Sequence, residues 1–357
     1  VELDGERVAE TVTLPADGEM TVSLDHARAV ERWTLDDPTL YTVTATVGDD
    51  ERRERVGFRT VSVTDSDLLL NGDPVPLRGV NRHEDHPEWG HAQPERIQAR
   101  DLSLIESMGG NFVRTSHYPN HPRLLDLCDE RGILVMEELP YWQFSGDRFA
   151  RDPVLDRGKT MLREMIARDR THPAIVAWGL TNECAGHEDT VYEAVGDLAA
   201  IARDLDDRPV TLASMNYQPD KRAHDPTFEH CDIVCLNGYQ GWYTEGDWDE
   251  ILDPAREDYP EKPIIVSEFG AGAVYGERTW ENQKWSEGHQ AEVVLDAVTA
   301  FEDAPDVAGF AVWQFCDTWT TTERFAGRPK GKNNKGLVDE YRRPKEAYQR
   351  LRSFLTD

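Results

Sequence analysis

The segment Ile175-Val-Ala-Trp-Gly-Leu-Thr-Asn-Glu183 is a run of apolar residues that ends in polar ones. A near-continuous apolar run of this length is typical of a strand that is buried on both faces of a parallel sheet. Similar segments recur along the chain, and most are separated by amphipathic stretches with helical periodicity. The expected strands are residues 77–81, 111–115, 133–138, 175–182, 209–214, 233–237, 264–268 and 307–314. The expected helices lie near residues 95–108, 121–131, 155–171, 188–206, 283–303 and 344–355.

This alternation of strands and helices predicts an α/β fold. Eight strand–helix units over roughly 290 residues are the expected content of a closed (β/α)₈ TIM barrel, with an open doubly wound sheet as the alternative. No Gly-x-Gly-x-x-Gly motif follows the first expected strand, which argues against a dinucleotide-binding fold. We therefore expect residues 65–357 to form a catalytic TIM barrel.

The first 64 residues have a different pattern, with short β-branched segments at 11–14, 20–24, 40–47 and 54–63. They predict a small β-sandwich, or part of one, and Asn71-Gly-Asp73 follows it as a hairpin-type turn. The chain opens at Val1 within strand-like sequence and without an initiator Met, so we expect it to be a fragment of a longer polypeptide.

The composition excludes some partners. Asp and Glu number 68 against 39 Lys and Arg, a formal charge of −29 that repels phosphate backbones and argues against nucleic-acid binding. The acidic residues are dispersed, which suits either a high-salt, halophilic milieu or an ordinary acidic surface. No apolar run is long enough to span a membrane. The five cysteines are scattered and favour a reducing, cytoplasmic setting, and a homo-oligomer is possible.

Polar residues follow seven of the eight expected strands. In a barrel, the chemistry belongs at the carboxyl ends of the strands, where these side chains would share one site. The strand-end segments are Asn81-Arg-His-Glu84, Arg114-Thr-Ser-His-Tyr118, Glu137-Glu138, Thr181-Asn-Glu183, Asn237-Gly-Tyr239, Ser267-Glu-Phe-Gly270 and Trp313-Gln314. Taken singly, Glu137 or Glu138 could be a solvated rim residue, and His83 with His86 lacks a third ligand for zinc.

Two carboxylates stand out because each ends a strongly apolar strand. Glu183 follows the fourth strand and Glu268 the seventh, on opposite sides of the barrel mouth. Cleavage of a glycosidic bond needs one carboxylic acid that protonates the leaving oxygen and one carboxylate that attacks the anomeric carbon. We therefore predict a glycosidase with Glu183 and Glu268 as its catalytic pair, which would be retaining with carboxyl groups about 5–5.5 Å apart and inverting at about 6.5–9.5 Å.

At these residues the sequence resembles glycoside hydrolase family 2. The motifs are Gly79-Val-Asn-Arg-His-Glu-Asp85, Arg114-Thr-Ser-His-Tyr-Pro119, Trp178-Gly-Leu-Thr-Asn-Glu183 and Ser267-Glu-Phe-Gly270. The resemblance implies an immunoglobulin-like sandwich before the barrel, and a retaining β-glycosidase that works by double displacement with Glu183 as general acid/base and Glu268 as nucleophile. It further implies that Asn182 bonds the sugar 2-hydroxyl, that His83 and His117 contact the sugar, and that Trp313 lies under its face.

Two further segments are similar to the β-glucuronidase branch of that family. Asn237-Gly-Tyr-Gln-Gly-Trp-Tyr243 resembles its tyrosine loop, which would place Tyr239 near the nucleophile and Tyr243 near the substrate. Lys332-Asn-Asn-Lys-Gly336 resembles the motif that binds the sugar carboxylate, here through Asn333 and Lys335. The alternative for this segment is an ordinary Lys/Asn-rich surface loop.

The match to that branch has departures. Pro329 stands where the branch usually has Arg, with Arg328 and Lys330 beside it, and the family's N-terminal sugar-binding jelly-roll domain does not precede Val1. Tyr118-Pro-Asn-His-Pro122 is close to the β-galactosidase branch, so a β-galactoside is the rival to a β-glucuronide as carbohydrate substrate. A barrel that only binds carbohydrate is a third possibility, which the presence of both glutamates disfavours. We expect no cofactor and no required metal.

Overall fold

The centre of the computed structural model, which describes residues 1–13, 18, 20–25, 29–219, 224–320 and 328–356, is a closed barrel of eight parallel strands. Strand β15 pairs with β8 with Gly309 opposite Leu77, and this pairing closes the ring. The TIM barrel is thus confirmed, and the open sheet is wrong. The strands are β8 (Leu77–Asn81), β9 (Phe112–Arg114), β10 (Leu134–Glu138), β11 (Ile175–Asn182), β12 (Val210–Ser214), β13 (Val234–Asn237), β14 (Ile264–Phe269) and β15 (Val307–Val312).

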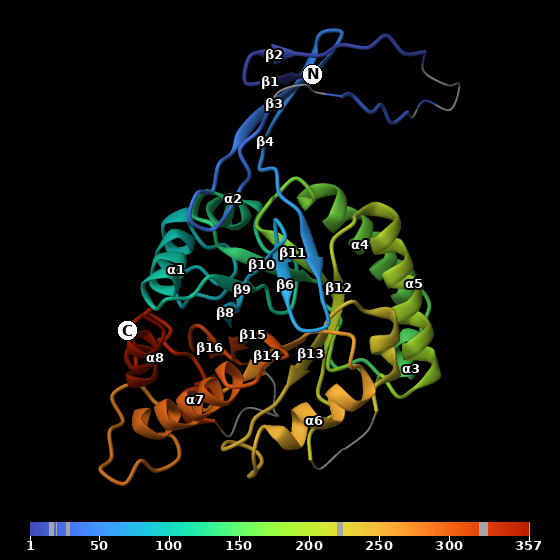
Figure 1. Ribbon diagram of the computed structural model, residues 1–357. Helices are drawn as coiled ribbons and strands as arrows, with labels where there is room; N and C mark the ends of the chain where they lie inside the picture. Colours follow the sequence, from blue (N-terminus) through green and yellow to red (C-terminus); the bar gives the residue numbers. More distant parts are fainter. Residues whose placement is uncertain (14–17, 19, 26–28, 220–223, 321–327, 357) are drawn as a thin grey trace.

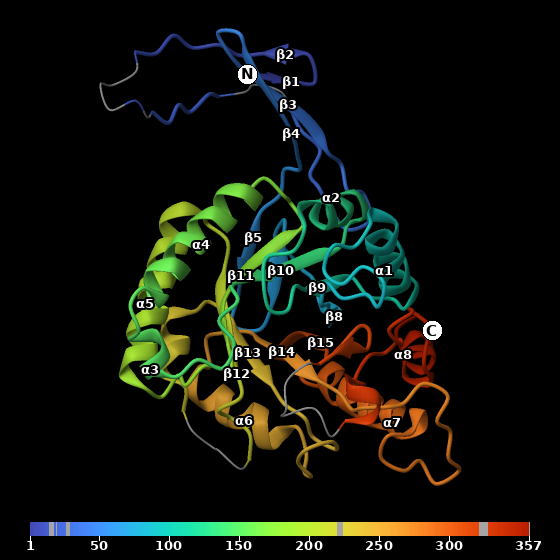
Figure 2. The ribbon, with the colours of Figure 1, turned by 180° about the vertical axis from the view of Figure 1, so that it is seen from behind.

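Helices surround this barrel (Figures 1 and 2). They are α1 (Glu95–Ser107), α2 (Pro122–Arg131), α3 (Gly146–Phe149), α4 (Val154–Asp169), α5 (Asp189–Leu205), α6 (Asp249–Asp258), α7 (Glu287–Glu302) and α8 (Glu346–Thr356), with short 3₁₀ turns η1 (Pro226–His230) and η3 (Pro329–Gly331). Helix α6 was not expected, because its internal Pro254 and many acidic residues obscure an apolar face of Ile251, Leu252 and Ala255.

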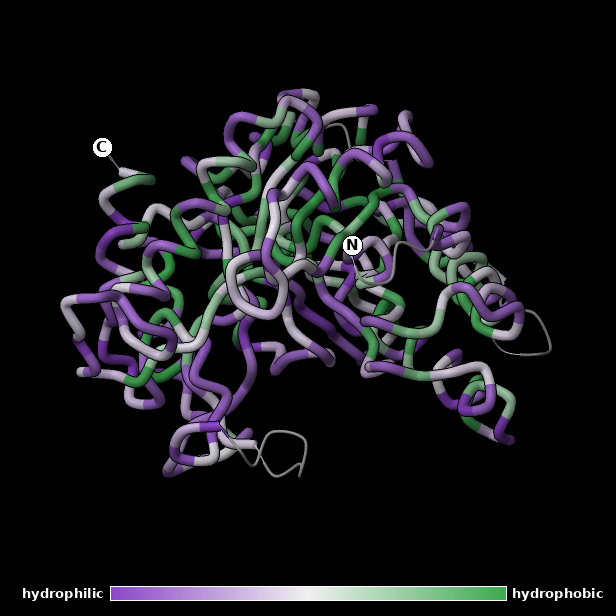
Figure 3. Tube along the Cα trace, turned by 90° about the horizontal axis from the view of Figure 1, so that it is seen from below, coloured by the Kyte–Doolittle hydropathy of each residue, from purple (hydrophilic) through white to green (hydrophobic). Residues whose placement is uncertain are grey.

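Apolar residues gather inside the ring of helices and polar residues lie on the outer loops (Figure 3). Trp178 of β11, Phe112 of β9 and Leu77 of β8 are completely buried. Burial of each such side chain stabilises the fold by about 1.5–3 kcal/mol. Among the described helices, none is long and apolar enough to cross a membrane.

The N-terminal residues form an antiparallel sheet that projects from one end of the barrel (Figure 1). Its order is β2-β1-β3-β4, from β1 (Glu2–Leu3), β2 (Glu6–Arg7), β3 (Tyr41–Val47) and β4 (Asp50–Val56). The strands expected at 11–14 and 20–24 are wrong for the described residues there, which are irregular, whereas Leu14 lies outside the described residues. The immunoglobulin-like sandwich therefore stays a prediction.

The segment expected as one strand at 54–63 is divided between two sheets. Its end, β5 (Val61–Val63), pairs with β6 (Leu68–Leu70), which pairs with β7 (Asp73–Pro74). Asn71 and Gly72 connect β6 to β7 with φ values of 59° and 93°. Two consecutive positive φ values are those of a type I′ hairpin turn, so the turn predicted from Asn71-Gly72 is confirmed.

Arg59 attaches the N-terminal region to the barrel by donating to the carbonyls of Pro173 (3.0 Å) and Ile175 (2.8 Å). These carbonyls lie at the start of β11, whereas Glu183 follows its end. The N-terminal sheet and the strand-end glutamates are therefore at opposite ends of the barrel. After β15 the chain forms a small hairpin of β16 (Thr318–Trp319) and β17 (Lys332–Asn333) on the glutamate side.

Candidate active site

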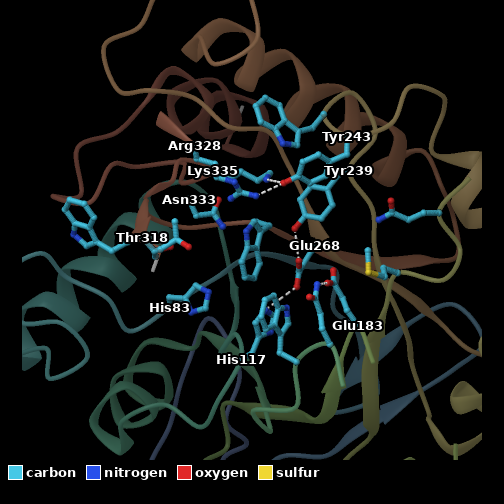
Figure 4. Close-up of a pocket in the computed structure, with 18 of the residues that line it drawn as sticks. His83, His117, Glu183, Tyr239, Tyr243, Glu268, Thr318, Arg328, Asn333 and Lys335 are labelled. Atoms are coloured by element: carbon cyan, nitrogen blue, oxygen red, sulfur yellow. Dashed lines mark hydrogen bonds and ion pairs between the residues drawn. The ribbon is translucent and has the colours of Figure 1, made fainter. Parts of the chain in front are cut away.

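A cavity of about 860 Å³ lies at the carboxyl ends of the barrel strands (Figure 4). Of the residues predicted from the sequence, it is lined by His83, His117, Glu183, Tyr239, Tyr243, Glu268, Trp313, Asn333 and Lys335. Asn182 is fully buried next to the lining. Barrel closure has therefore brought side chains from distant parts of the sequence into one place.

Glu183 lies directly after β11 in a left-handed backbone conformation, with φ 52°. Its amide donates to the carbonyl of Ala213 at 2.8 Å, which fixes the turn. Gln143 Nε2 donates to Glu183 Oε2 at 2.7 Å, and Asn237 Nδ2 donates to Oε1 at 3.1 Å. Both carboxyl oxygens are thus oriented by neutral amides, and the group faces the cavity (Figure 4).

Glu268 of β14 is held by stronger donors. Arg114 Nη1 donates to Oε1 at 2.9 Å, and the Tyr239 hydroxyl donates to Oε2 at 2.7 Å. Burial raises the pKa of Glu268, and the charge of Glu183 adds to this effect, whereas Arg114, His117 and the Tyr239 hydrogen bond lower it. The arrangement stabilises an anion on Glu268 against the cost of burial, which suits a nucleophile.

Arg114 connects the floor of the site. Besides Glu268, it donates to Glu138 Oε2 at 2.9 Å, to Asn81 Oδ1 at 2.8 Å and to Asn182 Oδ1 at 2.7 Å. The guanidinium is completely buried, so it acts on the cavity through these neighbours. Asn182 Nδ2 is buried and has no hydrogen-bond partner among the described residues.

Two histidines and a tryptophan form one wall. His117 stacks on Trp313 with ring centroids 5.1 Å apart, and its Nδ1 lies 2.5 Å from Glu138 Oε1. His83 meets the Trp313 ring edge-on at 5.3 Å. Burial lowers the pKa of His83 to about 3, with His117 adding to the effect, so His83 is neutral near pH 7. These rings offer an apolar platform with polar edges.

The opposite end of the cavity is cationic. Lys335 Nζ donates to the Tyr243 hydroxyl at 2.7 Å, and Arg328 Nη2 donates to the same oxygen at 2.6 Å. Lys335 is only 3% exposed and lies over the Tyr239 ring at 5.1 Å. Burial lowers the pKa of Lys335 well below its usual value, with Arg328 adding to this and Glu268 opposing it. An anion bound here would offset that cost.

The family described as "Glycosyl hydrolases family 2, TIM barrel domain" matches residues 61–357. The chain belongs to glycoside hydrolase family 2. Its curated relatives include a β-glucuronidase of Streptococcus agalactiae, 31% identical over 90% of this chain and 58% of the relative. The human β-glucuronidase is 33% identical over 83% of this chain and 46% of the relative. The family 2 chain thus spans about half the length of these relatives.

Solved structures of relatives agree with this family 2 assignment. A β-galacturonidase of Eisenbergiella tayi bound to galacturonate superposes with a TM-score of 0.86 at 37% identity, over 91% of this chain and 59% of that one. A β-glucuronidase of Faecalibacterium prausnitzii gives 0.84 at 34% identity, over 95% and 60% of the two chains.

Some residues of this family 2 site were not predicted. Arg114 and Asn237 end expected strands, and this position was the available signal for both. The sequence motifs include Arg328 only as a neighbour of Pro329, yet Arg328 lines the cavity together with Lys335. Gln143 and Trp142 come from the loop after β10, and no sequence pattern pointed to them.

The family 2 chain has one group of potential metal ligands in its described part, formed by Asp126, Asp129 and His172 within 4.8 Å of one another. Asp129 Oδ2 lies 2.5 Å from His172 Nδ1, and Arg55 and Arg123 each lie 3.3 Å from an Asp126 oxygen. These ion pairs already account for the cluster, so we assign it no metal. His83 and His86 do not form such a group among the described residues.

Proposed function

We propose that this chain is the catalytic barrel of a retaining β-glycosidase that hydrolyses terminal β-glucuronides. The observation that carries the proposal is a single cavity with two glutamates at one end and two cations at the other. In a protein of net charge −29, Lys335 and Arg328 beside a sugar site favour a substrate that carries its own negative charge. The β-glucuronidase relatives support the same substrate class.

In the proposed mechanism Glu268 attacks the anomeric carbon while Glu183 gives its proton to the departing glycosidic oxygen. A carbon–oxygen bond forms to Glu268 as the bond to the aglycone breaks. Once Glu268 is esterified, Glu183 takes a proton from water, and the water oxygen displaces Glu268 from the sugar. Arg114 and Tyr239 stabilise Glu268 as the carboxylate that attacks and that leaves.

The remaining residues hold the sugar. Asn182, with its unpaired Nδ2, would donate to the 2-hydroxyl. His83 and His117 would contact hydroxyls at the barrel mouth, and Trp313 would lie against the sugar face. Asn333, Lys335 and Tyr243 would bind the C6 carboxylate, with Arg328 beside them in the role usually taken by an arginine at the place of Pro329.

The catalytic assignment is tested by two substitutions. Glu268→Gln should lower turnover of p-nitrophenyl β-glucuronide by about a thousand-fold or more. Glu183→Ala should be partly rescued by azide, because azide can attack the glycosyl-enzyme without a general base. For the native enzyme, NMR should show the β-anomer of the sugar as the first product. Glu137→Gln is the matched control, because Glu137 is a buried strand-end glutamate that bonds Asn120 and lies outside the cavity lining. If azide does not rescue Glu183→Ala, the assignment of Glu183 as general acid/base is wrong.

A β-galacturonide is a second candidate, favoured by the 37% identity to the Eisenbergiella tayi β-galacturonidase. It carries the same C6 carboxylate and differs at C4. Faster cleavage of a neutral β-galactoside, unaffected by Lys335→Ala, would instead support the β-galactosidase branch.

We also propose the division into an immunoglobulin-like unit at 1–64 and the barrel at 65–357. Further proposals are a jelly-roll domain upstream of this chain, which the greater length of the relatives supports, and assembly as a homo-oligomer. A cytoplasmic location is supported by the five buried, unpaired cysteines.

A further inference from the structure

We propose that a buried ion pair, Lys345 with Asp317, positions the loop that carries Lys335 and so sets the preference of the site for a C6 carboxylate. This inference rests on the proposed function and names residues that the sequence did not indicate. Lys345 is completely buried and Asp317 is 2% exposed. Neither is among the residues that line the cavity. They are therefore positioning residues, and they act through Lys335.

Lys345 uses all three of its N–H donors on this loop and its surroundings. Its Nζ donates to Asp317 Oδ1 at 2.7 Å, to the Asn334 carbonyl at 3.0 Å and to the Ala273 carbonyl at 2.8 Å. The Asn334 carbonyl also accepts from the Ala273 amide at 2.9 Å. The backbone immediately before Lys335 is thereby fixed.

Asp317 holds the backbone immediately after Lys335. Its Oδ1 accepts from the Gly336 amide at 2.9 Å, and its own amide donates to the Val338 carbonyl at 3.0 Å. A side chain at position 336 would place Cβ only 2.2 Å from the Asp317 nitrogen, so the two backbones approach as closely as glycine allows. The Lys345–Asp317 ion pair therefore bonds to the backbone of both residues that flank Lys335.

Two glutamines complete the anchoring. The Gln314 amide donates to the Lys335 carbonyl at 3.1 Å, and Gln290 Nε2 donates to the Gly336 carbonyl at 3.0 Å. Gln314 follows β15 by two residues and Gln290 lies in α7, so the loop is attached to elements of the barrel.

The physical need for such an anchor follows from the charge on Lys335. Lys335 is buried near Arg328, and both donate to the Tyr243 hydroxyl (Figure 4). Desolvation and repulsion favour movement of the ammonium toward solvent whenever no anion is bound. A loop that is held in place keeps the cation at the carboxylate position before substrate arrives, which saves the free energy of ordering it on binding.

The experiment compares kcat/KM for p-nitrophenyl β-glucuronide and p-nitrophenyl β-glucoside, which differ only at C6. Lys345→Met should lower the value for the glucuronide by about 10- to 100-fold, mainly through KM, and the value for the glucoside by less than about three-fold. Equal losses on both substrates, or no loss on the glucuronide, would overturn the proposal. Both values of kcat/KM are measured on the full-length protein.

Two further variants protect this test from a folding failure. The double variant Asp317→Asn/Lys345→Met removes both charges and so avoids the free-energy cost of a lone buried carboxylate. It should show the same selective loss on the glucuronide. Arg208→Met is the matched control: Arg208 is a cation with 8% exposure that donates to the Arg170 carbonyl (2.6 Å), just before β12 at the other end of the barrel. It should lower stability and leave the ratio of the two substrates unchanged.

Lys335→Met separates this inference from the function on which it depends. If the native enzyme does not prefer the glucuronide and Lys335→Met changes nothing, the proposed function fails. If Lys335→Met removes the preference but Lys345→Met retains it, the positioning role alone is wrong.

Discussion

Tyr239 donates its hydroxyl hydrogen to Glu268 Oε2, and Arg114 donates to Oε1. The two donors oppose burial and the charge of Glu183, which both favour the protonated form of Glu268. At the scale of single residues, the proposed catalysis thus depends on a balance between desolvation and a few charge-assisted hydrogen bonds.

The pH dependence of kcat/KM should reveal that balance. The pKa of Glu268 is raised and the proposed mechanism needs its anion, so activity should fall as the pH drops through that raised value. Tyr239→Phe removes a hydrogen bond that lowers this pKa, so the acid limb should move upward by about one pH unit. Tyr243→Phe, which does not bond Glu268 in the described structure, should change KM and leave the limb in place. An unmoved limb in Tyr239→Phe would contradict this account.

The lowered pKa of Lys335 predicts a second effect of pH on activity, at alkaline pH. The charge of Lys335 is lost as the pH rises through that lowered pKa. The kcat/KM for a glucuronide should therefore fall at high pH, while that for a neutral glucoside should lack this loss. Parallel alkaline profiles for the two substrates would show that Lys335 does not bind the carboxylate as a cation.

At the scale of elements, the N-terminal region is attached to the amino end of the barrel by side-chain and close backbone contacts. Trp33 is completely buried, and its Nε1 donates to the Asp129 carbonyl in α2 at 2.8 Å. Gly132 caps the C-terminus of α2, and a Cβ at this position would lie 2.2 Å from the Leu35 carbonyl oxygen. The close contact at Gly132 joins the two parts of the chain.

Trp33→Ala should reduce the free energy of unfolding by about 3–5 kcal/mol, because it leaves a large cavity and an unpaired carbonyl. Urea unfolding followed by circular dichroism measures the change. Trp280→Ala is the control, since Trp280 is 91% exposed and should have little effect. Where the Trp33 variant is folded, its turnover should be normal, because the site is at the other end of the barrel.

At the scale of the whole molecule, the dominant feature is the net charge of −29. Mutual repulsion of so many carboxylates opposes the compact state. At 1 M salt the Debye length is about 3 Å, so repulsion between more distant charges is largely screened. Adaptation to high salt stays a prediction from the sequence. It can be tested, because salt should stabilise the fold by screening this repulsion.

The midpoint of thermal unfolding should rise by about 10 °C or more between roughly 0.1 and 2 M KCl. Sucrose at matched osmolality serves as the control for excluded solutes, since it does not screen charge. A midpoint that is insensitive to KCl would identify the acidic surface as an ordinary one.

Local pattern by itself determined the barrel strands and the two glutamates. A buried parallel strand needs a continuous apolar run, and a barrel places whatever follows each run at one mouth, so Glu183 and Glu268 could be located from Ile175–Asn182 and Ile264–Phe269. Weakly patterned segments gave poorer predictions, as the irregular residues at 20–24 show.

Only the tertiary structure decided how these groups are held. Arg114 joins Glu268 to Asn182, Gln143 reaches Glu183 from another loop, and Lys345 fixes the backbone around Lys335. These contacts join residues far apart in the sequence, and their existence depends on the closure of the ring. Periodicity along a chain reports which face of an element is buried, and it carries no information about which side chain from another element will meet it there.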